Sequence, residues 1–318
     1  MAIGKTSGAR GGALILVLWL AAALAAVTLT LAQTVRTELE RATTALESTQ
    51  AYYLACGAIE RALLYMLWGP PYYAPGATSL RFDFPSGEAV VQILPEAGKL
   101  NVNFSPLDEL ERLFVALGAE PARAAEIARA IVDWRSPAPH GPTLFDREYL
   151  SRTPSFRAAH ASFQETEELL LVKGMTPELY YGTIEPGPEG AWLARGGARD
   201  CLSVYSAGGA VDVNSAHPAV LAAIGLGPGE IQAILATRPL RDPIQLQGLG
   251  LAGHPALGRL RLGGGSVVTL RAMARPRLPN GQLSDLRRGV GATVKLFGAA
   301  AGEKPYHVLR WYDQVWEP

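Results

Sequence analysis

The chain has 318 residues, with 29 basic and 29 acidic side chains, 48% apolar residues and two cysteines. This neutral, apolar-rich composition excludes a disordered chain, and it excludes a domain whose whole surface is basic, as polyanion-binding domains usually are. Two cysteines are too few for a multi-disulfide scaffold or a four-cysteine zinc site, and the length predicts about two domains.

The first predicted element is a membrane-spanning helix. No charged side chain lies between Gly11 and Val35, and this run exceeds the ~20 apolar residues that cross a bilayer. Lys5 and Arg10 precede it, which predicts that the N-terminus stays in the cytoplasm. The run is longer than the apolar core of a secretory signal, and no clear small-x-small cleavage site follows it. We therefore expect this helix to remain in the mature protein.

The same helix is predicted to continue beyond the membrane. After Arg36 the sequence is polar and amphipathic, without proline until Pro70-Pro71, which ends the element. Apolar and small side chains recur near a period of 3.6 and form a stripe that can pack on a neighbour: Leu39, Ala42, Leu46, Thr49 and Tyr53. One helix of about 55 residues, or ~80 Å, is expected.

A small β-sheet is predicted next, in two separate parts of the chain. Residues 81–84 and 88–94 are expected to form a hairpin around the turn Pro85-Ser86-Gly87, because apolar and polar residues alternate in these runs or residues that favour β-strands are frequent in them. Further strands are expected at 266–273, 292–296 and 307–312. A hairpin alone is marginally stable, so all five should form one sheet on the second half of the long helix. Either Val91 and Ile93, or Val90 and Leu94, would face that helix, depending on register.

A repeated helical pattern separates the two parts of the sheet. Asn101 to Pro106 precedes a short apolar-faced helix closed by Gly118, and Asp212 to Pro218 precedes another closed by Gly225. Residues 162–174 repeat the theme, and further helices are expected over 122–134 and 229–237. The predicted fold class is therefore α+β, with an all-helical domain of helix–hairpin–helix type inserted in a small antiparallel sheet.

The N-terminus resembles that of a known family. A short basic leader ends at Arg10-Gly11-Gly12 and directly joins the apolar run, as in type IV pilin-like precursors. Within these, the chain resembles the minor pseudopilin K family of type II secretion systems. The segments 100–103, 168–175 and 213–216 match recurrent segments of that family, in the same order.

This resemblance implies how the N-terminus is processed. Prepilin peptidase would cut after Gly11, and the new N-terminal Gly12 would be N-methylated. Most pilins carry Glu at the fifth mature position, where it meets the N-terminal amine of the preceding subunit, and the K proteins lack it. That position is Leu16 here, which suits a subunit that ends a filament.

The resemblance also implies an architecture and a role. The role is a non-enzymatic minor pseudopilin in the bacterial inner membrane, at the pseudopilus tip, which starts assembly with minor pseudopilins I and J. Other pseudopilins, the inner-membrane assembly platform and prepilin peptidase are the further partners, and most of the chain would be periplasmic. The expected parts are leader 1–11, transmembrane helix 12–35, periplasmic helix 36–69, first sheet part 70–97, inserted helical domain 98–262 and second sheet part 263–318.

A membrane-anchored, competence-type DNA receptor is the alternative, because helix–hairpin–helix units bind DNA elsewhere. Gly225-Leu226-Gly227-Pro228 is close to a phosphate-binding hairpin. However, Glu230 stands where a basic residue would help, and residues 98–262 hold 18 acidic and 15 basic side chains. DNA affinity depends largely on neutralising phosphates, so nucleic acid is not the expected partner.

A calcium ion is implied by the resemblance alone. K-family members bind calcium through acidic residues after an Asp-Trp pair and in a later acidic-Tyr stretch, which correspond here to Asp133, Asp146 and Glu148. Three carboxylates are few for an ion that takes six to eight oxygens. The alternative is a proline-rich loop with ordinary surface acids.

The remaining reactive side chains predict no catalysis. The five histidines are scattered, and the sequence lacks nucleophile-elbow, phosphate-loop and dinucleotide motifs. Cys56 and Cys201 could form a disulfide in an oxidising periplasm, or each could be a small buried residue.

Overall fold

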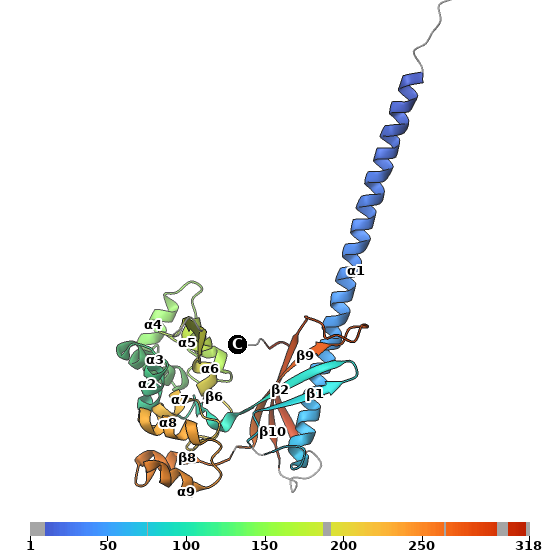
Figure 1. Ribbon diagram of the computed structural model, residues 1–318. Coiled ribbons are helices and arrows are strands. Elements are labelled where there is room, and N and C mark those ends of the chain that lie inside the picture. Colours follow the sequence, from blue (N-terminus) through green and yellow to red (C-terminus); the bar gives the residue numbers. More distant parts are fainter. Residues whose placement is uncertain (1–9, 75, 187–191, 264, 298–304, 316–318) are drawn as a thin grey trace, which may run out of the picture.

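The computed structural model describes residues 10–74, 76–186, 192–263, 265–297 and 305–315. Figure 1 shows a long helix, α1, that projects as a rod from a head with two lobes. One lobe is a sheet packed on the lower end of α1, and the other is a cluster of short helices beside it. Each lobe has its own hydrophobic core.

Helix α1 runs from Arg10 to Trp68 as one element of 59 residues, or roughly 90 Å. Its last turns bury one stripe at helical spacing: Ala51, Leu54, Ala55, Ala58, Ile59, Ala62 and Leu63. Four of these are alanines, and alanines 89, 272, 274 and 292 are buried in the same core on the sheet side. Small residues on both surfaces let the helix approach the sheet closely.

The sheet has five antiparallel strands in the order β1-β2-β9-β10-β11. They are β1 (Ser79–Phe84), β2 (Gly87–Pro95), β9 (Val267–Pro276), β10 (Arg288–Leu296) and β11 (Tyr306–Tyr312). The predicted single sheet on the long helix is thus confirmed. Val91 and Ile93 face the core beneath α1. Of the two predicted alternatives, this pair, and not Val90 and Leu94, faces the helix.

The chain between β2 and β9 forms the helical lobe. Its helices are α2 (Leu107–Ala116), α3 (Pro121–Arg135), α4 (Leu144–Leu150), α5 (Pro177–Tyr181), α6 (Ala198–Cys201), α7 (Pro218–Ala223), α8 (Pro228–Thr237) and α9 (Pro243–Leu246). Short helical turns lie at η1 (Glu96–Gly98), η2 (Thr166–Leu171), η4 (Gln247–Leu251) and η5 (Pro255–Arg259).

The lobe is not all-helical, which corrects the sequence-based expectation. It contains three two-stranded pairs: β3 (Leu100–Asn101) with β6 (Leu202–Ser203), β4 (Thr183–Pro186) with β5 (Trp192–Arg195), and β7 (Val211–Asp212) with β8 (Leu260–Arg261). Two of the pairs are only two residues long. A pairing that short leaves little alternation in the sequence, which is why pattern analysis missed it.

The repeat predicted from the sequence is present in three dimensions. Asn103 donates to the carbonyl of Phe163 and accepts from its amide, at 3.0 and 2.7 Å. Asn214 does the same to Leu240, at 2.9 and 2.8 Å. Each asparagine follows one strand of a short parallel pair and precedes a helix, a glycine with positive φ, and a second helix. The same local arrangement of strand, asparagine, helix, glycine and helix therefore occurs twice in the helical lobe.

Candidate functional site

The N-terminal half of α1 is the first candidate surface. It is long and apolar enough to cross a membrane, and none of its most apolar stretch is buried in the structure. Leu16 is 67% exposed within this stretch. Gly11 and Gly12 lie in the first turns of α1, and a side chain added at Gly12 would meet nothing within 4 Å. The first nine leader residues lie outside the described part of the chain.

The middle of α1 offers a second exposed apolar surface. Leu39, Leu46 and Tyr53 follow each other at intervals of seven residues, and all three are exposed. Residues spaced by seven lie on one side of an α-helix. From Ala51 onward a different side of the helix is covered by the sheet. We call Leu39, Leu46 and Tyr53 the free stripe of α1, and it corresponds to part of the stripe predicted from the sequence.

The three acidic residues considered for calcium do not form a metal site. Asp146 is buried and accepts from the amides of Thr143 and Ala158, both at 3.1 Å, and from Nε2 of His160 at 2.8 Å. Asp133 accepts from the hydroxyl of Thr143 at 3.0 Å. N–H and O–H donors thus occupy the oxygens that a cation would need.

Glu148 has different contacts from those of Asp133 and Asp146. It forms ion pairs with Lys173 and with Arg152, the latter at 3.5 Å. Within the described residues, no three histidine, cysteine, aspartate or glutamate side chains are grouped to hold a metal ion. The contacts of these residues therefore do not fit a calcium site, which favours the second of the two alternatives that the sequence left open.

His160 is the basic partner of Asp146. Its Nδ1 lies 3.0 Å from the carbonyl oxygen of Ser136 and 3.2 Å from that of Asp133, while Nε2 faces Asp146. Both ring nitrogens face acceptors, so the imidazolium, which donates from both, fits best. Burial alone would lower the pKa of His160, but its hydrogen bonds to Asp146 and to the carbonyls outweigh burial and raise it.

The same pair sets the ionisation of Asp146. Burial acts to raise the pKa of Asp146, but hydrogen bonds from His160 and from two backbone amides outweigh burial and lower it. No local pattern in the sequence pointed to His160, because it lies 14 positions from Asp146 across a loop. The Thr143–Asp146 capping box of α4 is the one local signal for this arrangement.

The structure places the two cysteines apart, which favours the second of the alternatives that the sequence left open, two unpaired thiols. Both are free. Cys56 is half-buried on α1 beside the sheet core, whereas Cys201 is buried in the core of the helical lobe. Burial raises the pKa of both thiols. Two residues in separate cores cannot meet the short Cα separation of a disulfide.

The hairpin considered for phosphate binding is occupied by the chain itself. The amide of Gly227 donates to Oε2 of Glu230 at 2.6 Å, at the start of α8. A phosphate would need that amide and would be repelled by the carboxylate. The contact weighs against the DNA-receptor alternative.

A buried polar cluster joins the two lobes and was not found from the sequence. Glu96, in η1, accepts from the hydroxyl of Thr269 on β9 at 2.6 Å and from Lys99 at 3.1 Å. Burial acts to raise the pKa of Glu96, but the charge of Lys99 and hydrogen bonds from Ser203 and Thr269 outweigh it and lower the pKa. Arg310 on β11 forms a second link, an ion pair with Glu165 of the helical lobe.

Comparison with known proteins agrees with this picture. A family model described as type II secretion system (T2SS), protein K, matches residues 92–183. The type II secretion system protein K of Klebsiella pneumoniae is 26% identical over 197 residues, which cover 54% of this chain and 60% of that protein. The chain thus matches about three fifths of the length of this relative.

A solved structure shares the fold. A chain in the crystal structure of the GspK–GspI–GspJ complex from the type 2 secretion system of enterotoxigenic Escherichia coli aligns with a TM-score of 0.51 at 17% identity. The alignment covers 87% of this chain and 97% of that chain.

A long apolar helix and a mixed head of sheet and helices are thus the fold that this chain shares with a chain of the GspK–GspI–GspJ complex. In sequence, the chain is similar to type II secretion system protein K over residues 92–183 and over the 197 residues aligned with the Klebsiella protein.

Proposed function

We propose that this chain is a minor pseudopilin that caps the pseudopilus and starts its assembly together with minor pseudopilins I and J. In this role it has no enzymatic activity. Helix α1 anchors it in the inner membrane with its N-terminus in the cytoplasm, and the two-lobed head lies in the periplasm. The other pseudopilins, the inner-membrane assembly platform and prepilin peptidase are its further partners. The proposal extends what is stated of the relatives to this chain.

The observation that carries the proposal is Leu16, in the exposed apolar part of α1. A carboxylate inside a membrane is costly unless a partner neutralises it. By the resemblance, that partner in other pilins is the amine of the preceding subunit. Leu16 offers no such carboxylate. A subunit of this kind has a partner on one side only, which is the requirement for a terminal position.

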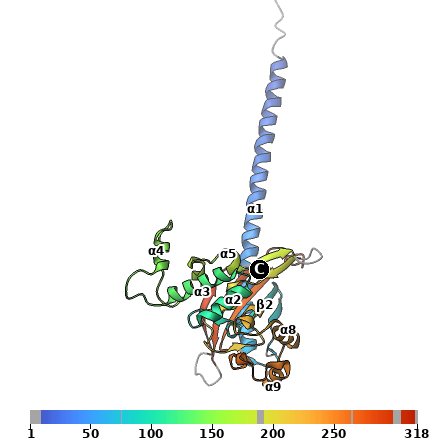
Figure 2. The same ribbon diagram turned by 90° about the vertical axis from the view of Figure 1, so that its left-hand side faces the viewer.

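The shape of the head supports the same position. In Figure 1 the helical lobe lies to the left of α1 and the sheet, and in Figure 2, turned by 90°, the same lobe lies in front of them. Subunits inside a helical filament are surrounded by neighbours on all sides. A side lobe of this size would collide with those neighbours, whereas a tip leaves it free.

The free stripe of α1 gives the assembly surface. Leu39, Leu46 and Tyr53 are exposed although they are large and apolar. Apolar side chains repeated every seven residues are typical of helices that pack side by side. We propose that the α1 helices of partners I and J cover this stripe.

N-terminal processing provides the first experiment. The full chain is expressed with prepilin peptidase, and the mature protein is analysed by intact mass spectrometry. We expect loss of residues 1–11 and one added methyl group at Gly12. Gly11→Leu should keep the leader, whereas Gly57→Ala, at an open position on the same helix, should mature normally. A mature chain that begins beyond Ala32 would overturn the proposal.

Assembly provides the second experiment. Leu46→Gln removes the centre of the free stripe, and Thr44→Gln changes an exposed residue on another side of α1. Co-purification of pseudopilins I and J from membranes should fall for the first variant and stay normal for the second. Equal recovery of I and J with both variants would show that the stripe is not the assembly surface.

A further inference from the structure

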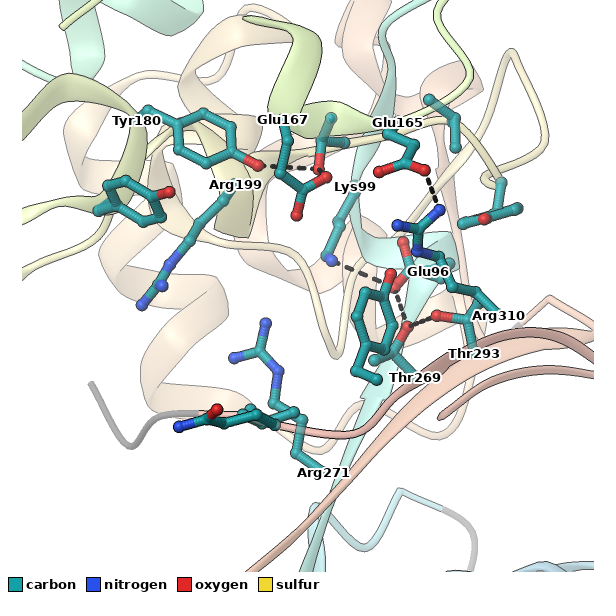
Figure 3. Close-up of a pocket in the computed structure, with 17 residues that line it drawn as sticks. Glu96, Lys99, Glu165, Glu167, Tyr180, Arg199, Thr269, Arg271, Thr293 and Arg310 are labelled. Atoms are coloured by element: carbon teal, nitrogen blue, oxygen red, sulfur yellow. Dashed lines mark hydrogen bonds and ion pairs between the residues drawn. The ribbon is translucent and has the colours of Figure 1, made fainter. Parts of the chain in front are cut away.

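A cavity of about 230 Å³ lies where the two lobes meet. Figure 3 shows its lining, with the sheet strands on one side and the helical lobe on the other. The sheet contributes Thr269, Arg271, Thr293, Arg310 and Tyr312, and the helical lobe contributes Glu165, Glu167, Tyr180, Tyr181 and Arg199. Polar, charged and aromatic groups therefore converge on one cavity.

Most charges in this cavity are already paired. Glu96 is engaged by Lys99 and Thr269, and Glu165 is engaged by Arg310. Two of the three lining arginines, Arg199 and Arg271, are not used in these pairs.

Arg199 has only a weak acidic neighbour. It comes from the four-residue helix α6 and lies over the ring of Tyr181, with 5.5 Å between Cζ and the ring centroid. Its nearest carboxylate is that of Asp200, 3.8 Å from Nε, and Nε itself is buried without a hydrogen-bond partner. A guanidinium in this state can accept a better anionic partner.

Arg271 comes from the opposite wall. Its neighbours Leu270 and Ala272 on β9 face α1, so by strand alternation Arg271 faces the helical lobe. Among the described residues, no ion-pair or hydrogen-bond partner is recorded for its guanidinium. In Figure 3 the guanidinium groups of Arg199 and Arg271 both point into the same open space.

We propose that this cavity binds a carboxylate ligand between Arg199 and Arg271. A guanidinium offers parallel N–H donors that match the two oxygens of a carboxylate. Glu167 also lines the cavity, and its carboxylate has no basic partner among the described residues. Together with the two arginines it leaves a small positive excess, which suits one or two carboxylates better than a highly charged polyphosphate.

The site has a structural consequence, because each lobe supplies one arginine. A carboxylate held by both would link the helical lobe to the sheet and oppose their separation. The carboxylate could belong to a free organic acid or to an acidic side chain of a partner protein. This inference is independent of the proposed place in the pseudopilus.

Titration calorimetry on the full chain in detergent tests the proposal. The probes are citrate, the capped dipeptide acetyl-Glu-Glu-amide, and the uncharged succinamide as control. We expect both acids to bind and succinamide not to bind. Tighter binding of citrate would indicate a free acid as the natural ligand, and tighter binding of the dipeptide would indicate a protein side chain.

Variants establish where the acids bind. Arg199→Gln and Arg271→Gln should each weaken binding by about tenfold or more, since each removes a charge-assisted pair. Arg271→Lys keeps the charge without the planar fork and should weaken binding less. Arg129→Gln changes an exposed arginine on α3 and should have no effect.

Two results would overturn the proposal. The first is that neither acid binds the unaltered chain at tens of millimolar. The second is that binding is unchanged in the Arg199 and Arg271 variants. Melting curves without ligand show whether each variant is folded, so a loss of binding with an unchanged melting temperature is assigned to the site.

Discussion

Replacing His160 with Gln is expected to destabilise the helical lobe, because His160 links the loop after α3 to Asp146 of α4. The imidazole links Asp146, which is 3% exposed, to the carbonyls of Ser136 and Asp133. Gln can replace one of these hydrogen bonds but cannot supply the positive charge. The carboxylate of Asp146 would then be buried without its cation.

The magnitude follows from what remains around Asp146. Removing one partner of a buried ion pair costs about 3–5 kcal/mol. Here the amides of Thr143 and Ala158 still donate to the carboxylate, so we expect about 2–3 kcal/mol. For a chain of 318 residues, whose unfolding entropy is about 2.1 cal/mol/K per residue, that corresponds to a fall in Tm of roughly 3–5 °C. His160→Gln and Asp146→Asn together should cost less than the sum of the two.

Thermal and urea unfolding of the full chain in detergent, followed by circular dichroism, measure this cost. The control is Asp108→Asn, which breaks an exposed pair with Arg112 at 2.9 Å. Exposed pairs one helical turn apart contribute about 0.3–0.5 kcal/mol, so this control should change Tm very little. Calcium and a calcium chelator should leave the Tm of the unaltered chain the same.

Two results would refute this reasoning. A loss in His160→Gln no larger than in the Asp108 control would mean that the imidazole carries no structural charge. A rise in Tm of several degrees on adding calcium would mean that the carboxylates of this loop bind the metal after all.

Three further predictions concern Glu96 at the lobe junction, the two asparagines of the repeated unit, and the two thiols. Glu96→Gln should lower the free energy of unfolding by about 2 kcal/mol at neutral pH. The pKa of Glu96 is lowered in the folded state, so its contribution to stability is present above the unfolded pKa and is lost as pH falls through the folded pKa. The variant and the unaltered protein should therefore unfold alike in strong acid. Asn103→Ala and Asn214→Ala should each lower the free energy of unfolding in urea by about 2–4 kcal/mol, since each variant loses two equivalent hydrogen bonds. Very different losses would show that the two asparagines do not play the same structural role. A thiol-reactive dye should label Cys56 in the folded chain and Cys201 only after unfolding. If neither thiol is labelled under denaturing, non-reducing conditions, the cysteines are paired and this prediction is wrong.

The sequence was sufficient wherever structure depends on neighbouring residues. Helical periodicity and the final Pro70-Pro71 located α1, and alternation located the strands of the sheet. The sequence also predicted that Gly118 and Gly225 end their helices. Both adopt the positive φ that glycine tolerates best. Each of these features is set by a few consecutive side chains.

The sequence could not decide how distant segments meet. Val91 and Val90 fit a strand equally well, and only packing against α1 selected Val91 for the core. The alternatives left open for calcium and for the cysteines also depend on contacts between distant segments: His160 lies beside Asp146, and the cysteines lie in different cores.

The junction between the lobes was set by tertiary structure alone. Arg199 and Arg271 carry no local signal, and they converge only because the insertion folds back beside β9. Local patterns are encoded by the conformational preferences of short segments, whereas convergence of this kind depends on which apolar faces the whole chain can bury together.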